Sequence, residues 1–453
     1  MNRTDFLEKT WAAYPEGKLG WTDVAEFIEK GKPAKTVVAG RLIVAQQTDF
    51  AHVVYTLNSG GGEIVLAFKT TLEWMEPQAS RSLELKQTEP LSLDLFEDGD
   101  LIAVEGANEI SGTFEVSKIL LLVPSSRSVE LPFSEFTVPR AKLWSDYLSE
   151  VRAHFVSKGF LESTTPTLVP SPGTEPFLDP FKTQWEMGSE KRDFYLPTSP
   201  EFHLKQLLVR GFTKLFEIKP CFRNGEVGSH HQPEFLMLEW YRAYSNLEAI
   251  ALDVESLLET LASKFQLNVP KLRRCTMPQL FAVAYPGFEL KPETTREELA
   301  AVAEKTAIAV SADDSFDDLF FRLFLEKIEP NLGADGPLLV SHYPPSQAAL
   351  SRIGDHGFAE RFEIYWKGLE LANAFHELNR VEENEARFAD DATKKKALNK
   401  PSVPRDENLV RALRYGMPPS GGIALGVDRL FMAMFGIEKI QDARAFPITL
   451  HPY

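Results

Sequence analysis

Five short apolar runs with polar positions in alternation mark the first part of the chain. They are TVVAGRLIVAQ, AHVVYTLN, GEIVLAFKT, DLIAVEGANE and EVSKILLLV, between residues 36 and 123. Alternation with a period of two predicts half-buried β-strands, and Gly60–Gly62 favours a tight hairpin between the second and third runs. About five short strands in roughly a hundred residues predict a small closed barrel of the oligonucleotide/oligosaccharide-binding (OB) type, although a β-sandwich gives a similar pattern.

From residue 138 onward the pattern mixes helical and strand periodicity. KLWSDYLSEVRAHFVSKGF has apolar residues at helical spacing and ends beside Gly159, as a helix does. Two pairs of strand-like runs follow, one pair around a polar loop and one around Lys367-Gly368, and each pair predicts an antiparallel hairpin. The hairpin runs and a final strand–turn–helix unit are LFEIKPCFRN, FLMLEWYRAY, FEIYW, LELANAF and GGIALGVDRLFMAMFG.

The length of 453 residues exceeds the usual size of one domain. Residues 123–136, VPSSRSVELPFSEF, are polar and contain proline, which is typical of a linker. We therefore expect an α+β protein with an N-terminal OB-like β-barrel domain over residues 1–130. A second domain over residues 138–453 would combine antiparallel strands with helices.

Composition narrows the class of protein further. Hydrophobic residues make up 43% and charged residues 25%, as in ordinary soluble globular proteins. No apolar run approaches the roughly 20 residues of a membrane span, and the N-terminus lacks the apolar segment of a secretion signal. The two cysteines, Cys221 and Cys275, have no metal-like spacing and fit a reducing compartment. We expect a cytoplasmic protein without a membrane partner.

The net charge indicates which class of partner the protein binds. The net charge is −16, and residues 1–130 hold 12 lysines and arginines against 20 aspartates and glutamates. Because phosphate contacts dominate affinity for nucleic acids, this balance favours a small molecule or a protein as the partner. A barrel that docks a protein is therefore favoured over one that binds RNA, and the RNA-binding alternative stays open.

Two arginines, Arg223 and Arg429, follow predicted strands in glycine-containing contexts. When a carboxylate attacks the α-phosphate of ATP, charge builds on the phosphate oxygens, and planar guanidinium groups stabilise it. The small residues before Arg429 would let the backbone approach an adenine ring. The sequence has neither a Walker loop nor a dinucleotide fingerprint. A lone arginine more often forms a surface ion pair, which is the alternative for each.

Three glutamates, Glu363, Glu370 and Glu377, recur at seven-residue intervals around Lys367-Gly368. In a two-residue hairpin, Glu363 and Glu370 would lie on facing strands with compatible side-chain direction. Like charges among apolar strands are costly unless a cation compensates them, and Mg²⁺ shared with ATP phosphates would do so. The alternative is a pair of solvent-facing carboxylates.

Together these segments resemble the class II aminoacyl-tRNA synthetases. FRN with HHQPEFLMLEWYRAY resembles motif 2 of that class, and GIALGVDRLFMAMFG resembles motif 3. GFLESTTPTLVP, with Pro166, resembles motif 1, which forms the dimer interface in the class. TSPEFHLKQLL and ELANAFHEL are similar to the lysyl branch. The resemblance covers residues 138–453 and implies an antiparallel catalytic sheet, ATP as a substrate and a homodimer.

Within the lysyl branch, the sequence is similar both to lysyl-tRNA synthetases and to the ligases that attach β-lysine to elongation factor P. Four features resemble the ligases: SHYPPSQAAL, Trp240, His376 and Ala424. Ala424 stands where the tRNA enzymes typically have glycine, and an added methyl group reshapes an amino-acid pocket.

The resemblance implies roles in binding ATP and metal. Arg223 and Arg429 would be catalytic residues that bind the α- and γ-phosphate regions, and Glu363 and Glu370 would hold Mg²⁺. Motif 2 usually has glutamate where this chain has Gly225. The implied ATP-binding residues are Arg223, Asn224, Glu226, Gln232 (usually asparagine), Glu370, Leu371, Gly426 and Arg429.

The resemblance also implies an amino-acid pocket. Glu201 would meet the substrate's amino group, and Tyr241 and Glu377 would receive its side-chain ammonium, since a buried cation needs a carboxylate partner. The implied substrate-binding residues are Ser199, Pro200, Glu201, Tyr241, Asn373, Phe375, Glu377 and Ala424.

The leading hypothesis is ATP-dependent activation of lysine or β-lysine as its adenylate, followed by ligation to a lysine side chain of elongation factor P. The first alternative is a lysyl-tRNA synthetase that charges tRNA through its barrel. In its favour, the elongation factor P ligases ordinarily lack an N-terminal barrel. The second alternative is a non-catalytic, synthetase-like regulator.

Overall fold

The structure is a computed structural model that describes residues 22–29, 36–47, 52–59, 62–69, 99–108, 113–123 and 138–447. The linker expected at residues 123–136 lies outside this part of the chain except for its first residue, and so do the first two glycines of Gly60–Gly62. The chain forms two compact units, residues 1–142 and residues 143–452.

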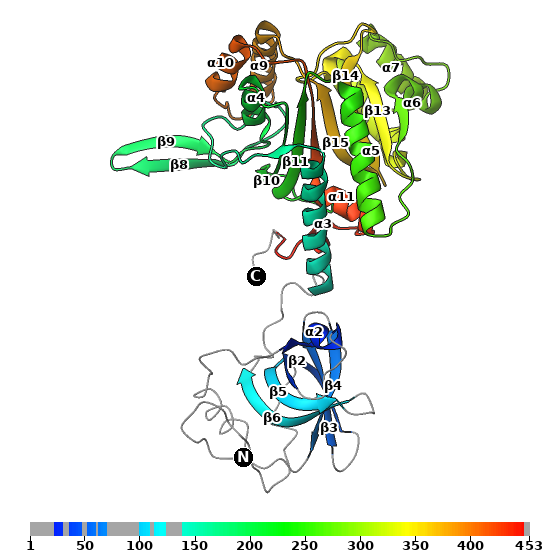
Figure 1. The fold of residues 1–453 in the computed structure, drawn as a ribbon. Helices are drawn as coiled ribbons and strands as arrows, with labels where there is room; N and C mark the ends of the chain where they lie inside the picture. The colour runs from blue at the N-terminus through cyan, green and yellow to red at the C-terminus, as the bar shows by residue number, and fades with distance from the viewer. Residues whose placement is uncertain are drawn as a thin grey trace. The chain divides into compact units, whose positions relative to one another are not determined.

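Five strands of the first unit close into a barrel (Figure 1). The ring runs β2–β3–β4–β6–β5 and closes through the pairing of β5 with β2. The OB-like barrel is therefore confirmed and the sandwich alternative is wrong. The strands are β2 (Thr36–Gln47), β3 (His52–Ser59), β4 (Gly62–Lys69), β5 (Leu101–Asn108) and β6 (Phe114–Val123).

A short strand and helix precede the ring. β1 (Thr22–Asp23) pairs with β2, and α2 (Val24–Glu29) packs its buried Phe27 edge-on against Phe114, with ring centroids 5.5 Å apart. This aromatic pair is part of the barrel core, together with buried strand residues such as Leu42, Leu66 and Val104.

An eight-stranded sheet organises the second unit, in the order β12-β13-β14-β15-β16-β11-β10-β7. Its six central strands pair antiparallel, and only the two edge strands pair parallel. The predicted α+β class with an antiparallel sheet is confirmed. The strands are β7 (Leu161–Glu162), β10 (Lys214–Phe222), β11 (Glu234–Ala243), β12 (Arg273–Thr276), β13 (Leu338–Tyr343), β14 (Ala359–Trp366), β15 (Leu369–His376) and β16 (Ser420–Gly426).

Three helices, α3 (Val138–Ser157), α5 (Leu247–Lys264) and α11 (Val427–Phe435), contribute to the core of this sheet. Figure 1 shows α3 and α5 running along the strands. Because side chains alternate along a strand, one face packs against these helices and the other is free to build a site. Buried residues of this core are Tyr147, Val151, Phe155, Trp240, Leu257, Phe362, Ile364 and Phe431.

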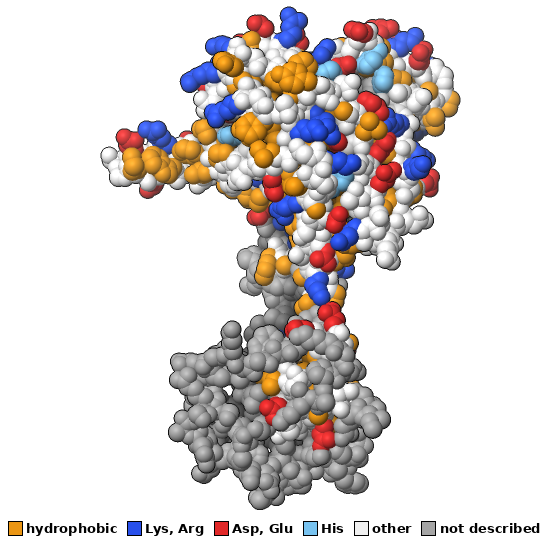
Figure 2. All heavy atoms as spheres, viewed as in Figure 1, with side chains coloured by type: hydrophobic (Ala, Val, Ile, Leu, Met, Phe, Trp, Pro, Cys, Tyr) orange, Lys and Arg blue, Asp and Glu red, His pale blue; other side chains and the backbone are white. Residues whose placement is uncertain are grey.

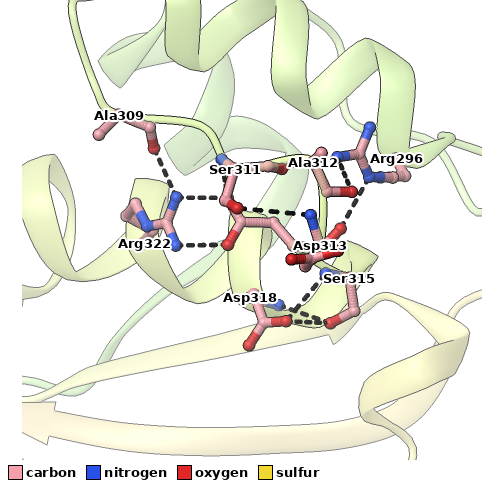
Figure 3. A network of polar contacts seen from close by, with 9 residues as sticks. Arg296, Ala309, Ser311, Ala312, Asp313, Ser315, Asp318 and Arg322 are labelled. Carbon is pink, nitrogen blue, oxygen red and sulfur yellow. Dashed lines mark hydrogen bonds and ion pairs between the residues drawn. The ribbon is translucent and has the colours of Figure 1, made fainter.

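Residues 277–337 carry helices α6 (Met277–Ala284), α7 (Arg296–Lys305) and α8 (Phe316–Lys327) between β12 and β13. Figure 3 shows the polar contacts that fix the loop between α7 and α8. Arg322 binds Asp314 with two hydrogen bonds of 2.6 and 2.7 Å, and Arg296 donates to backbone carbonyls of the same loop. These contacts tie the loop to α7 and α8, and both helices share an apolar cluster with Val340 and Tyr343 of β13.

A second helical group, α4 (Glu201–Val209), α9 (Val381–Ala397) and α10 (Glu407–Tyr415), shares a smaller apolar cluster. Beside it in Figure 1, β8 (Lys182–Met187) and β9 (Glu190–Tyr195) form a separate two-stranded ribbon. Figure 2 shows apolar side chains on this ribbon, where Trp185 and Met187 are exposed. None of the helices described has the length and apolar character needed to cross a membrane.

Candidate active site

The register of four strands places several predicted residues in one row across the sheet. Glu239 of β11 pairs with Ala424 of β16. Asn373 of β15 pairs with Ala424 on one side and with Glu363 of β14 on the other. Residues that pair across strands point to the same face, so a single face carries all four.

A neighbouring row holds Tyr241, Gly422, Phe375 and Arg361 on the same four strands. A Cβ atom at Gly422 would lie 2.3 Å from Glu377 Oε1 and 2.3 Å from the Tyr241 ring. Only glycine fits there, since such distances are far inside van der Waals contact. Gly422 therefore leaves the space over this face of the sheet that Glu377 and Tyr241 occupy.

The two rows border a cavity of about 500 Å³. Most of the residues predicted for ATP, metal or amino acid line it, although Pro200, Asn224, Tyr241 and Glu377 do not. Tyr241 and Glu377 are buried behind the wall, and Asn224 uses its backbone N–H to bind the carbonyl of Asp179 at 2.7 Å. The predicted residues in the lining are Ser199, Glu201, Arg223, Glu226, Gln232, Glu363, Glu370, Leu371, Asn373, Phe375, Ala424, Gly426 and Arg429.

One end of the cavity holds both predicted arginines. Arg223 directly follows β10, and its guanidinium lies 5.0 Å from the centroid of the Phe235 ring. Arg429, on α11, donates to the backbone carbonyl of Glu370 at 2.8 Å and to His231 Nε2 at 2.6 Å. Burial and the charge of Arg429 lower the pKa of His231, so this imidazole stays neutral and can accept that bond.

The helix that carries Arg429 is anchored by its neighbour Asp428. This buried carboxylate accepts hydrogen bonds from the backbone N–H of Leu236 at 2.7 Å and from Arg444 at 2.8 Å. The contacts join β11 to α11, so the position of Arg429 relative to the sheet is fixed before any phosphate binds.

Gly225 has a left-handed backbone with φ of +82°, a conformation that glycine adopts readily. Immediately after it, Glu226 lines the cavity and approaches Arg223 to 3.9 Å. A glutamate one position later than the motif 2 pattern therefore still reaches the same cavity.

The hairpin around Lys367-Gly368 is confirmed. Both residues have positive φ, +54° and +72°, as a tight two-residue turn between β14 and β15 requires. Glu370 lies opposite Tyr365, and a bulge after Ile364 shifts the register so that Glu363 lies opposite Asn373 rather than Ala372. The two glutamates line the same cavity without pairing directly.

Glu363 and Glu370 have different surroundings. Glu363 accepts hydrogen bonds from the hydroxyls of Tyr343 and Tyr365, each 2.5 Å long, and forms an ion pair with Arg361. Burial, and next the charge of Glu363, raise the pKa of Glu370 to about 7, against the opposing effect of Arg429. A cation here would relieve the repulsion between the two carboxylates.

Those two glutamates offer only part of a metal shell. Within the described residues, no group of three or more histidine, cysteine, aspartate or glutamate side chains is arranged to hold a metal ion. Two carboxylates fit Mg²⁺ when ATP phosphates supply further oxygen ligands, because Mg²⁺ commonly binds one or two carboxylates plus phosphates.

The other end of the cavity is acidic. Glu201 begins α4, and Glu239 is 1% exposed and accepts a hydrogen bond of 3.2 Å from the Tyr241 hydroxyl. Burial, and next the charge of Glu201, raise the pKa of Glu239 well above its usual value. The same two causes raise the pKa of Glu175, which also lines this end. A second cation is therefore favoured here over free carboxylates.

A lysine of the chain itself lies behind this acidic end. Lys205 Nζ is 2.5 Å from Glu201 Oε1 and 2.6 Å from Glu377 Oε2. Burial raises the pKa of Glu377 to about 7, although Lys205 acts in the opposite direction. In this structure, then, the ammonium partner of Glu377 is Lys205.

Sequence reasoning missed several residues of the site: Glu175, Lys205, His231, Glu239 and Arg361. Glu239 could have been found, because it stands two positions before Tyr241 in a strand and so shares its face. Lys205 could not, because its contact with Glu377 depends on how α4 packs against the sheet.

The features that distinguish the ligases from the tRNA enzymes differ in their placement. Ala424 and residues 349–350 of SHYPPSQAAL line the cavity. His376 instead pairs with Glu360 at 2.7 Å, and the indole of Trp240 is buried in the core and donates to Asp253. Only Ala424 and the SHYPPSQAAL segment therefore bear directly on the shape of the pocket.

A largely antiparallel sheet with two arginines and several carboxylates around one cavity fits a class II synthetase catalytic domain, the fold of ligases that activate an amino acid with ATP. The family model of the class II tRNA synthetases (D, K and N) matches residues 125–450. The chain belongs to this family.

Proposed function

We propose that this enzyme activates lysine or β-lysine as the aminoacyl-adenylate. The observation that supports this most strongly is the charge at the acidic end, where three carboxylates lie around one buried lysine of the chain. The carboxylates are Glu201, Glu239 and Glu377, and the lysine is Lys205. An amino acid with two ammonium groups supplies the charge that this end lacks.

The three amino acids in the family description can be compared by charge. Lysine brings two ammonium groups, whereas asparagine and aspartate bring one each. The side-chain carboxylate of aspartate would meet Glu239 and be repelled, and the amide of asparagine would leave a buried carboxylate without a charged partner. Charge thus separates lysine from both.

The proposed roles of individual residues follow from the geometry. Glu201 receives the amino group nearest the substrate carboxylate. Glu239 receives the side-chain ammonium, with Tyr241 and Glu377 behind it, and Asn373 and Phe375 shape the space between. The pocket is thus complementary to a chain that carries an ammonium at each end.

The proposed reaction transfers the adenylyl group of ATP. An oxygen of the amino-acid carboxylate forms a bond to the α-phosphorus, the bond to the pyrophosphate oxygen breaks, and pyrophosphate leaves with that electron pair. Arg223 and Arg429 stabilise charge on the phosphate oxygens, and Glu226, Gln232 and the backbone at Gly426 lie along the same end. Mg²⁺ held by Glu363 and Glu370 would neutralise phosphate charge when bound.

For the acceptor, we propose a lysine side chain of elongation factor P, whose ε-amine attacks the adenylate carbonyl and releases AMP. The acidity of residues 1–130 disfavours tRNA, and Ala424 and the SHYPPSQAAL segment, which resemble the ligases, line the cavity. We further propose a cytoplasmic homodimer that forms through the motif 1 region, where Val156 and Leu161 are exposed.

Pyrophosphate exchange with ATP tests the proposal. Exchange should depend on lysine or β-lysine and not on aspartate or asparagine, and its absence in folded protein would support a regulator instead. Offering tRNA and elongation factor P together then tests the acceptor. Charging of tRNA without modification of the factor would favour the tRNA-synthetase alternative.

A further inference from the structure

Lys205 is a buried charge for which the proposed reaction has no direct use. It lies on α4 one helical turn after Glu201, and its side chain is 2% exposed. Apolar residues of α4 and α10, among them Leu204, Leu208 and Leu413, form the cluster around this helix. A lysine in such surroundings is costly unless its ammonium is paired.

The pairing of Lys205 is close on both sides. Its Nζ atom bridges Glu201 Oε1 at 2.5 Å and Glu377 Oε2 at 2.6 Å. Burial alone would lower the pKa of Lys205, but the two glutamates outweigh it and raise the pKa above its usual value. Lys205 therefore remains charged throughout the range in which the enzyme would work.

We propose that Lys205 is a positioning residue that sets the charge specificity of the amino-acid pocket. It orients the Glu201 carboxylate toward the cavity for the amino group next to the reacting carboxylate. It also neutralises Glu377, so that Glu201 and Glu239 are left to receive the two ammonium groups of the substrate. The inference rests on the proposed activation of lysine or β-lysine.

This arrangement explains why three carboxylates, Glu201, Glu239 and Glu377, require only two cations from the substrate. With Lys205 in place, Glu201 and Glu377 share an internal ammonium, and the pocket accepts one substrate with two ammonium groups. Without Lys205, Glu201 would lose the contact that fixes its direction, and Glu377 would lose the ammonium that lowers its pKa. Recognition of the amino acid would weaken while the ATP end, built on Arg223 and Arg429, would be unchanged.

The test uses the full chain in lysine-dependent pyrophosphate exchange. Lys205→Met should raise KM for lysine about tenfold or more, leave KM for ATP unchanged and move the pH dependence of KM to higher pH. Lys219→Met is the matched control, since Lys219 is also buried but binds the Thr165 carbonyl at 2.6 Å and pairs with Glu217, which does not line the cavity. It should lower thermal stability without changing KM.

A double variant, Lys205→Met with Glu377→Gln, separates positioning from folding. It has no uncompensated charge at position 377, so its thermal stability should recover, yet its KM for lysine should stay raised because Glu201 still lacks its partner. A wild-type KM in the double variant would overturn the role of Lys205 and leave the proposed function intact. If the wild-type enzyme instead activated aspartate or asparagine, both the inference and the proposed function would fail.

Discussion

Replacing Glu239 with glutamine removes one charge from the acidic end and leaves the shape of the side chain almost unchanged. Glu239 is buried, and the Tyr241 hydroxyl can still donate to the amide oxygen of glutamine. The substitution therefore tests the charge of the pocket with little disturbance of its packing.

The expected loss of affinity follows from the burial of Glu239. Breaking one member of a buried, hydrogen-bonded charge pair costs about 2–5 kcal/mol, which at about 1.4 kcal/mol per tenfold weakens lysine binding roughly 30-fold to several thousand-fold. Burial and Glu201 also raise the pKa of Glu239, so below that pKa the empty pocket holds a proton which an ammonium must displace. Lysine affinity in the wild type should rise with pH, by up to about tenfold per unit, and Glu239→Gln should flatten this dependence.

Although Glu239→Gln should weaken lysine binding, it should not lower the free energy of unfolding. A carboxyl whose pKa is raised by folding stabilises the protein at low pH and loses that contribution as pH rises through the folded-state pKa. Glu239 therefore costs folding free energy at pH 8, and Glu239→Gln should melt at the same temperature as the wild type or higher.

Isothermal titration with lysine, in buffers of different ionisation enthalpy, measures both the affinity and the proton release. Glu217→Gln is the matched control, because Glu217 pairs with Glu239 across β10 and β11 and is also buried, but does not line the cavity. It should lower stability, since Lys219 loses its charged partner while the amide oxygen can still accept from Thr165, and it should not weaken lysine binding. Lysine affinity in Glu239→Gln equal to that of the wild type would refute the charge reasoning.

Three further predictions concern other parts of the cavity. Gly422→Ala places a methyl group 2.3 Å from both Glu377 and Tyr241. Thermal melting should show a loss of about 1–3 kcal/mol, and the exchange assay should show a raised KM for lysine but not for ATP. An unchanged KM for lysine would contradict the contact. Arg429→Ala should lower exchange about 10²- to 10³-fold while circular dichroism stays unchanged, and near-normal exchange would mean that the motif 3 assignment is wrong. Removing Mg²⁺ with a chelator should abolish exchange but not lysine binding. Glu370→Gln should raise the Mg²⁺ concentration needed for half-maximal exchange. An unchanged Mg²⁺ requirement would contradict the role of Glu370 as a metal ligand.

The strands and their turns could be predicted because each is set by local chemistry. The barrel strands follow a period of two, which the chain needs in order to bury one side of each strand. The turn at Lys367-Gly368 needs two residues with positive φ, and a glycine at the second position makes that inexpensive in energy. Neither inference requires knowledge of distant contacts.

The relation between Glu363 and Glu370 was harder to predict. Spacing alone placed them on facing strands, and they do lie on neighbouring strands around one cavity. The bulge after Ile364 shifts the register, however, and a one-residue shift has no clear signal in the sequence. Strand membership was therefore predictable and the direct partner was not.

The direction of His376 shows a limit of reasoning from resemblance. Phe375 lines the cavity, so the next residue of the same strand must point to the opposite face, where His376 meets Glu360. A residue can thus distinguish two subfamilies without touching the substrate. The alternation of side chains along β15 would have predicted that Phe375 faces the cavity and that His376 faces away from it.

The opposite charges at the two ends of the cavity also determine how a substrate must lie in it. An amino acid placed with its side-chain ammonium at Glu239 directs its carboxylate toward the arginine end, and the reverse orientation would bring its carboxylate against Glu201 and Glu239. The residues proposed to select lysine would therefore also present the reacting oxygen to the α-phosphate, so a loss of charge at the acidic end should impair positioning for attack as well as affinity.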